Sequence, residues 1–204
     1  MQDKMDVFRE VASIASAHAS SALSEMLKRK IKLELPEVTF ISSQDIFKDI
    51  SESKPVVSVE IRLLSGIPGK VSLVLEEKGA YELIDRLYKE KKEVSTGSFT
   101  EAGLSLIKEI GNIVVGSYTG ALGFFLNTLI LPSIPILVSG TFYDAMKSII
   151  TPQEKFILLI EALFKEEGGQ IKGRIYFALT KEGRKMIEES CKKILKSLEE
   201  EGKK

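Results

Sequence analysis

Three polar residues stand at helical spacing at the start of a long uncharged stretch. Ser105, Glu109 and Asn112 occupy positions i, i+4 and i+7, so an α-helix places them on one face. The apolar residues between them fall largely on another face and predict a core-facing stripe. A carboxylate can form a charge-assisted bond to an ammonium group, and a carboxamide can both donate and accept hydrogen bonds to hold a water molecule. A single Glu/Asn pair at this spacing is nevertheless a common accident.

The pattern occurs a second time, 99 residues earlier in the chain. The constant offset pairs Asp6 with Ser105, Glu10 with Glu109, Ser13 with Asn112 and Pro36 with Pro135. Residues 69–75 and 173–179 also match, at an offset of 104. We therefore predict one domain made by tandem duplication with pseudo-twofold symmetry, with repeats at residues 1–96 and 97–204.

Each repeat has the same predicted order of elements, a long helix, then strands, then a closing helix. The helices are expected at 3–29, 78–90, 100–126, 141–149 and 181–198, and the strands at 31–35, 56–63, 70–75, 128–131, 156–164 and 174–179. Alternating apolar and polar residues over 57–63 are typical of a half-buried strand. Ser98 and Glu101 fit a capping box for the second long helix, and the polar segment 89–100 is expected to link the repeats.

Both long helices are rich in small residues. Residues 11–24 consist mostly of Ala and Ser and carry no formal charge. Small side chains let two helix backbones approach closely. We therefore expect the two long helices to pack side by side about the pseudo-twofold axis.

Composition limits the functions that the chain can have. Its 204 residues are 44% hydrophobic and carry a formal net charge of zero, which gives no electrostatic argument for binding nucleic acid. The one histidine, His18, and the one cysteine, Cys191, do not provide for a His- or Cys-rich metal site, a Ser-His-Asp triad or an internal disulfide. We expect both residues to be structural, and no metal to be bound by this chain itself.

The uncharged stretch, residues 110–143, is long enough to raise the possibility of a membrane span. Polar residues are scattered through it, and Pro132 and Pro135 interrupt it. The first residues are charged and lack the apolar segment of a secretory signal. We expect a cytoplasmic protein without membrane insertion.

The repeated pattern resembles the signature of the CheC, CheX and FliY phosphatases of chemotaxis, Asp/Ser-x3-Glu-x2-Asn-x22-Pro. Residues 105–135 match it fully and contain the family-like string GNIVVGSYTGAL, whereas residues 6–36 match except that Ser13 replaces the asparagine. The presence of two copies of the signature within 204 residues most resembles the arrangement in CheC. CheX carries one functional copy, and FliY adds a flagellar-switch domain for which we expect no residues here.

The resemblance implies an α/β fold of the α+β type, with a central antiparallel sheet and the two signature helices adjacent. It also implies binding to a phosphorylated CheY-like receiver domain. Glu109 would pair with a lysine of that partner, and Asn112 would orient the attacking water. The aspartyl phosphate and its Mg²⁺ would both belong to the partner.

Three points remain open at the level of sequence. Ser13 is shorter than asparagine, so we expect the first site, with Glu10, to be weak or inactive. A non-catalytic or weakly catalytic module that binds CheD, a receptor deamidase, is the alternative function, with Phe142 and Tyr143 either exposed anchors or core residues. A third reading is a paralogue that only sequesters the phosphorylated regulator.

Overall fold

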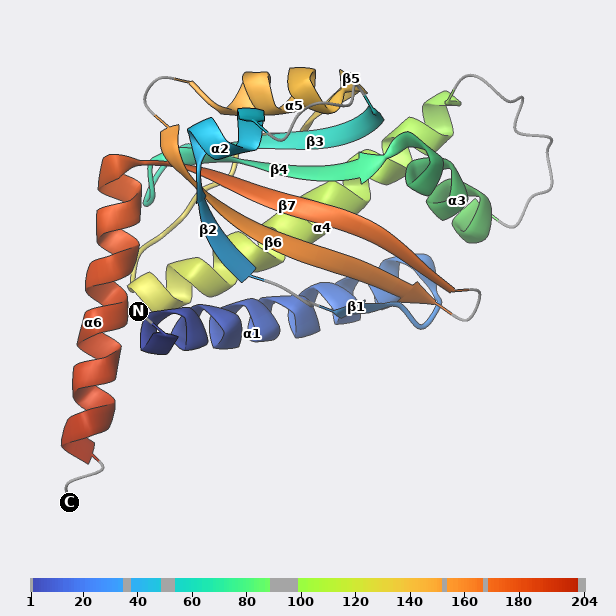
Figure 1. Cartoon of the computed structure of the whole chain (residues 1–204). Helices are drawn as coiled ribbons and strands as arrows, with labels where there is room; N and C mark the ends of the chain where they lie inside the picture. Colours follow the sequence, from blue (N-terminus) through green and yellow to red (C-terminus); the bar gives the residue numbers. More distant parts are fainter. Residues whose placement is uncertain are drawn as a thin grey trace.

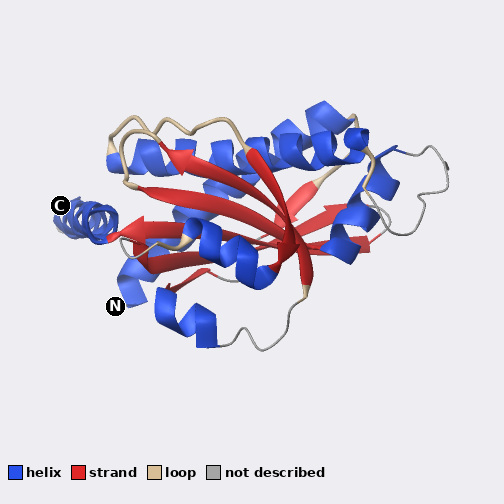
Figure 2. Cartoon of the chain, turned by 90° about the horizontal axis from the view of Figure 1, so that it is seen from above, coloured by secondary structure: helices blue, strands red, loops and turns tan. Residues whose placement is uncertain are grey.

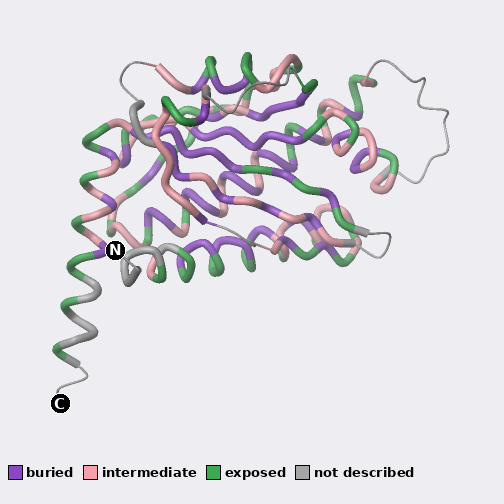
Figure 3. Tube along the Cα trace, in the orientation of Figure 1, coloured by how far each residue is buried: buried purple, intermediate pink, exposed green. Residues whose placement is uncertain are grey.

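The computed structural model describes residues 2–34, 38–48, 54–88, 99–151, 154–166 and 169–201. In this part of the chain a single antiparallel sheet is packed between helices (Figures 1 and 2). Long helices cover one face, and two short helices cover part of the other. Two buried clusters result, a large one under the long helices and a smaller one under the short helices (Figure 3).

The elements follow one another in the order of Figure 1. They are α1 (Gln2–Leu27), β1 (Lys32–Glu34), β2 (Val38–Ser42), α2 (Ser43–Lys48), β3 (Pro55–Leu63), β4 (Gly69–Glu76), α3 (Glu77–Tyr88), α4 (Glu101–Leu126), β5 (Ile136–Thr141), α5 (Phe142–Ile149), β6 (Glu154–Glu166), β7 (Gly169–Thr180) and α6 (Lys181–Glu201). The long helices, the closing helices and the main strands are confirmed. The sequence prediction missed β2 and α2.

The strand predicted at residues 128–131 is wrong. Asn127 ends α4 in the left-handed conformation, with φ of 49°, and its backbone N–H caps carbonyls of the last turn. The following residues carry Pro132 and Pro135, which have no N–H to give to a ladder. The regular strand β5 therefore begins only after Pro135. The apolar run at 128–131 thus precedes the strand, and the prolines delay the start of the strand.

The sheet interleaves strands from early and late parts of the chain. The order is β1-β6-β7-β4-β3-β5, with β2 also beside β6, and every pairing is antiparallel. The early strands β1 and β2 pair with the late strand β6, and the late strand β5 pairs with the early strand β3. The predicted central antiparallel sheet is confirmed, and neither half of the chain forms its sheet without the other.

The register of the two central strands bears on the predicted duplication. Ser72 of β4 lies opposite Tyr176 of β7, which is its equivalent at the offset of 104. A local twofold axis between two antiparallel strands requires one residue to lie opposite its own equivalent, as Ser72 and Tyr176 do. The superposition of residues 1–96 on 97–204 itself stays a prediction.

The two signature helices, α1 and α4, pack side by side on one face of the sheet, and they run in opposite directions (Figure 1). Val11 of α1 lines a small cavity with Leu122 of α4, and Leu23 of α1 lines another with Ile110. Ala15, which lies between these levels, is fully buried. The expected adjacency of the two long helices is confirmed.

The position of α4 is fixed at its start and near its middle. Thr100 is the N-cap, and its side chain accepts a bond from the Gly103 N–H at 3.1 Å, so the helix does not begin at a Ser98 capping box. Ser98 itself lies outside the described residues. At Gly111 a Cβ atom would stand 2.6 Å from Cβ of Val59 on β3. Glycine here therefore permits close packing of α4 on the sheet.

The glycines of α4 provide a matched test of this packing. Gly111→Ala should lower the free energy of unfolding by about 1–3 kcal/mol, because the added methyl overpacks the core against Val59. Gly116→Ala should raise it by about 1 kcal/mol through helix propensity, because a Cβ there meets no described atom within 4 Å. Urea unfolding of both variants measures the difference. Equal effects of the two substitutions would contradict the close contact at Gly111.

Candidate functional site

The intact signature faces outward from α4. Ser105 and Glu109 are exposed and Asn112 is half-buried, whereas Ile107 and Ile110 on the opposite side are fully buried. The helical spacing thus places the polar residues as expected. Because the buried side is locked in the core, the carboxylate and the carboxamide are held on a rigid support.

The first copy of the signature has the same outward position on α1. Asp6, Glu10 and Ser13 are all exposed. Arg9 Nη1 lies 2.8 Å from Asp6 Oδ1, but both side chains are about 60% exposed, so this pair contributes little to stability. Pro36, the last residue of this copy, lies outside the described residues.

The two sites lie toward opposite ends of the helix pair. Ile110 of α4, which is next to Glu109, is level with Leu23 of α1. Leu23 lies thirteen residues after Glu10 on α1. At about 1.5 Å of rise per residue, Glu109 and Glu10 are therefore about 20 Å apart along the pair. Both helices lie on the same face of the sheet (Figure 1) and carry these residues on their solvent-facing sides, so the two sites are separate positions.

The remaining residues singled out from the sequence are placed as follows. Pro135 is half-buried and directly precedes β5. His18 is exposed on α1, and Cys191 is fully buried in the main core. The cysteine is therefore a packing residue, as expected.

The structure separates Phe142 from Tyr143 at the start of α5. Phe142 is half-buried, with its ring centroid 5.7 Å from that of Tyr176. Tyr143 is 44% exposed, and its ring stands edge-on to that of Phe47. Lys147 Nζ lies 5.7 Å from the centroid of the Tyr143 ring. Only Tyr143 has the exposure that a docking anchor needs.

The start of α5 is well capped. Thr141 Oγ1 accepts a bond from the Asp144 N–H at 3.2 Å, and the Asp144 carboxylate accepts one from the Thr141 N–H at 3.1 Å. The hydroxyl and then the N–H of Thr141 lower the pKa of Asp144. This reciprocal pair fixes the direction in which Tyr143 projects.

A charged cluster on the opposite face of the sheet was missed from the sequence. Glu161 Oε1 lies 2.6 Å from Lys172 Nζ and 3.4 Å from Arg174 Nε. These bonds lower the pKa of Glu161, with the Lys172 bond as the largest cause. The available signal was the alternation of Lys172, Arg174 and Tyr176 along one face of β7.

The structure adds two findings on classes of function. No helix within the described ranges is both long and apolar enough to cross a bilayer. Across the same residues, no three or more His, Cys, Asp or Glu side chains gather as metal ligands would. Independence from a metal of its own stays a prediction.

Comparison with known proteins gives consistent relatives. No family model matches. The chain is 27% identical over 136 residues to the CheY-P phosphatase CheC of Bacillus subtilis, covering 66% of this chain and 65% of CheC. It is 29% identical over 112 residues to the flagellar motor switch phosphatase FliY of the same organism, covering 55% of this chain and 29% of FliY.

A solved structure extends the likeness to the fold. The crystal structure of Thermotoga maritima FliY matches with a TM-score of 0.77 and 25% identity, covering 95% of this chain and 98% of that one. The matched stretches span less than two thirds of either Bacillus subtilis relative. Together the sequence and structure matches support the CheC, CheX and FliY family.

Tyr118 on α4 offers a test of stability within the site's supporting core. Its hydroxyl is buried and has no partner among the described residues, and burial raises its pKa. Tyr118→Phe should leave the free energy of unfolding unchanged or raise it by about 1 kcal/mol, since an unpaired buried hydroxyl costs stability. Tyr176→Phe is the matched control, because it removes the interaction of the Tyr176 hydroxyl with Arg174, and it should cost about 1 kcal/mol. Chemical unfolding measures both, and a large loss for Tyr118→Phe would mean that its hydroxyl has a partner.

Proposed function

We propose that this protein is a phosphatase that hydrolyses the aspartyl phosphate of a CheY-like response regulator, chiefly through Glu109 and Asn112. The observation that carries the proposal is the full signature presented outward from α4, a helix whose other side is packed in the core. The likeness to a protein named CheY-P phosphatase CheC supports the same reaction.

Each side chain has a role that fits its chemistry. The Glu109 carboxylate is exposed and can form a charge-assisted bond to a lysine in the partner's active site, which fixes the docking register. The Asn112 carboxamide can accept from and donate to one water molecule without becoming a competing nucleophile. In-line attack on the phosphorus then breaks its bond to the aspartyl oxygen and releases inorganic phosphate.

Positioning supplies most of the catalysis in this scheme. Hydrolysis of an acyl phosphate depends on geometry and electrostatics more than on covalent help from the enzyme. The phosphate and its Mg²⁺ are supplied by the response regulator, so the residues of this chain only bind and orient. A pair of side chains three residues apart on a rigid helix enters the partner's site as one unit.

The first site is proposed to be weak. Glu10 is exposed and can still dock, but Ser13 has one polar atom on a shorter side chain. Its hydroxyl falls short of a water molecule that a carboxamide would reach. Activity should therefore belong mainly to the second site.

A regulatory module that binds CheD is the second candidate. The exposed Tyr143 and the adjacent Lys147 on the capped helix α5 are the observation that favours it. In that case catalysis by Glu109 and Asn112 would be slow and would depend on the partner. The two functions use opposite faces of the sheet, so one chain can carry both.

The decisive test compares the equivalent residues of the two sites. Asn112→Ala should slow the decay of the phosphorylated regulator by about a hundredfold, because α4 carries no other carboxamide side chain that could orient the water. Ser13→Ala should change the rate little, and Lys108→Ala controls for an exposed substitution on the same helix. The assay follows radiolabelled phosphate on candidate receiver domains in Mg²⁺. Equal losses at Asn112 and Ser13, or no loss at Asn112, would refute catalysis by α4.

Substitutions at the other positions separate docking from turnover. Glu109→Ala should weaken binding to the regulator as well as slow turnover, since its proposed role is to pair with the partner's lysine. Ser13→Asn restores the signature and should raise kcat/KM by up to about twofold, the gain expected from a second equivalent site. Steady-state kinetics with titration calorimetry give both quantities. Unchanged affinity in Glu109→Ala would contradict the docking role.

A further inference from the structure

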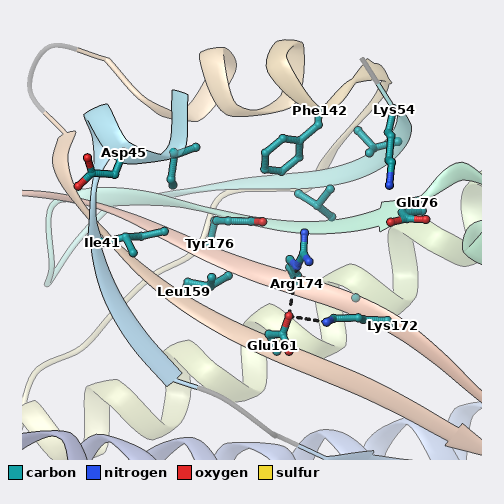
Figure 4. A pocket seen from close by; sticks show the side chains of 14 residues that line it. Ile41, Asp45, Lys54, Glu76, Phe142, Leu159, Glu161, Lys172, Arg174 and Tyr176 are labelled. Carbon is teal, nitrogen blue, oxygen red and sulfur yellow. Dashed lines mark hydrogen bonds and ion pairs between the residues drawn. The ribbon is translucent and has the colours of Figure 1, made fainter. Parts of the chain in front are cut away.

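The face of the sheet opposite α1 and α4 holds a cavity between its two short helices. α2 and α5, of 6 and 8 residues, leave the strands between them uncovered. The cavity has a volume of about 460 Å³ and lies over β4, β6 and β7 (Figure 4). This volume is in the range of small-molecule sites.

One half of the cavity is apolar. Ile41 and Ile46 line it beside α2, and Leu159 lies on its floor. The rings of Phe142 and Tyr176 have centroids 5.7 Å apart and are tilted by 53°. A ring or short alkyl chain placed between these side chains would be largely removed from water.

The other half of the cavity contains a weakly paired arginine. Arg174 points from β7 into the cavity (Figure 4), and its side chain is 45% exposed. Its Nε donates a long hydrogen bond of 3.4 Å to Glu161 Oε1, whereas Lys172 Nζ lies 2.6 Å from the same oxygen. Lys172 therefore neutralises most of the charge of Glu161, and Arg174 keeps donors for another acceptor.

A second donor lies beside the guanidinium. The Tyr176 hydroxyl points toward the Arg174 side chain (Figure 4); burial raises the pKa of Tyr176 to about 12, although Arg174 acts to lower it. The phenol is therefore protonated at neutral pH. Since the Arg174 guanidinium has no acceptor, the Tyr176 O–H cannot donate to it and remains able to donate to a ligand.

We propose that this cavity binds a small amphipathic carboxylic acid. Its carboxylate lies on Arg174 and Tyr176, and its apolar body extends under Phe142 toward α2. The charged residues that line the cavity are the carboxylates Asp45, Glu76 and Glu161 and the cations Lys54, Lys172 and Arg174. A single negative charge fits best, because the cations already face three carboxylates, which would repel a second charge on the ligand. The site lies on the opposite face of the sheet from Glu109 and Asn112, so this proposal does not depend on the proposed phosphatase activity.

The direct test is titration of the full chain with 4-phenylbutyrate, followed by calorimetry and by ¹⁵N chemical shifts. Saturable binding is expected, with shifts centred on β7, α2 and α5. The uncharged amide, 4-phenylbutyramide, should bind at least about tenfold more weakly, because it lacks the charge that Arg174 recognises. Absence of saturable binding, equal binding of the amide, or shifts centred on α1 and α4 would overturn the proposal.

Variants test the two donors. Arg174→Gln should weaken binding of 4-phenylbutyrate by about tenfold or more and Tyr176→Phe by a smaller factor, because each removes one donor. Arg184→Gln on α6 is the matched control, since Arg184 lies outside the cavity and pairs with Glu188 at 2.7 Å. Unchanged affinity in folded Arg174→Gln would refute the site. If that variant fails to fold, Tyr176→Phe and the shift map of the unaltered protein decide.

Phenyl phosphate, which carries up to two negative charges near neutral pH, distinguishes the charge class of the ligand. It should bind more weakly than 4-phenylbutyrate because of the three carboxylates, Asp45, Glu76 and Glu161, that line the cavity. Tighter binding of phenyl phosphate would replace the carboxylate assignment with a phosphate site.

Discussion

Close packing of α4 on the sheet is the constraint on which the proposed site depends. Gly111 brings the helix backbone against Val59, and the buried residues on either side of it hold the helix in one rotation. That rotation alone decides that Glu109 and Asn112 face outward. A turn of the helix by one residue, about 100°, would carry the carboxylate toward the flank of the helix, where it would have to lose water.

The two faces of the sheet differ in polarity. The face under α1 and α4 is covered by a continuous apolar layer that supports the helices and contains no ion pair among its buried members. The other face carries Glu161, Lys172 and Arg174 on strands that continue into the same sheet. Because alternate side chains of a strand point to opposite faces, one strand can serve both. The short helices α2 and α5 leave the charged part in contact with water.

The sequence predicted the parts of this fold that depend on periodicity and repetition. The helix spacing of Ser105, Glu109 and Asn112 predicted their common exposed face, and the Ala-rich segments predicted adjacent helices. Two features could not be read in this way. The position of β5 depends on the prolines that delay it, and the cluster at Arg174 joins residues of two strands whose register becomes known only when they pair.

The antiparallel arrangement of α1 and α4 has a consequence for stoichiometry. Glu10 and Glu109 lie on helices that cover the same face of the sheet, and they are about 20 Å apart along the helices. A folded domain of 100 residues has a radius of gyration of about 13 Å and is roughly 30–35 Å across. Under the proposed function, two such domains centred directly over both positions would overlap, so simultaneous docking requires the two domains to tilt away from each other. A partner that docks at the degenerate position would then restrict the angle at which a second partner reaches the intact one.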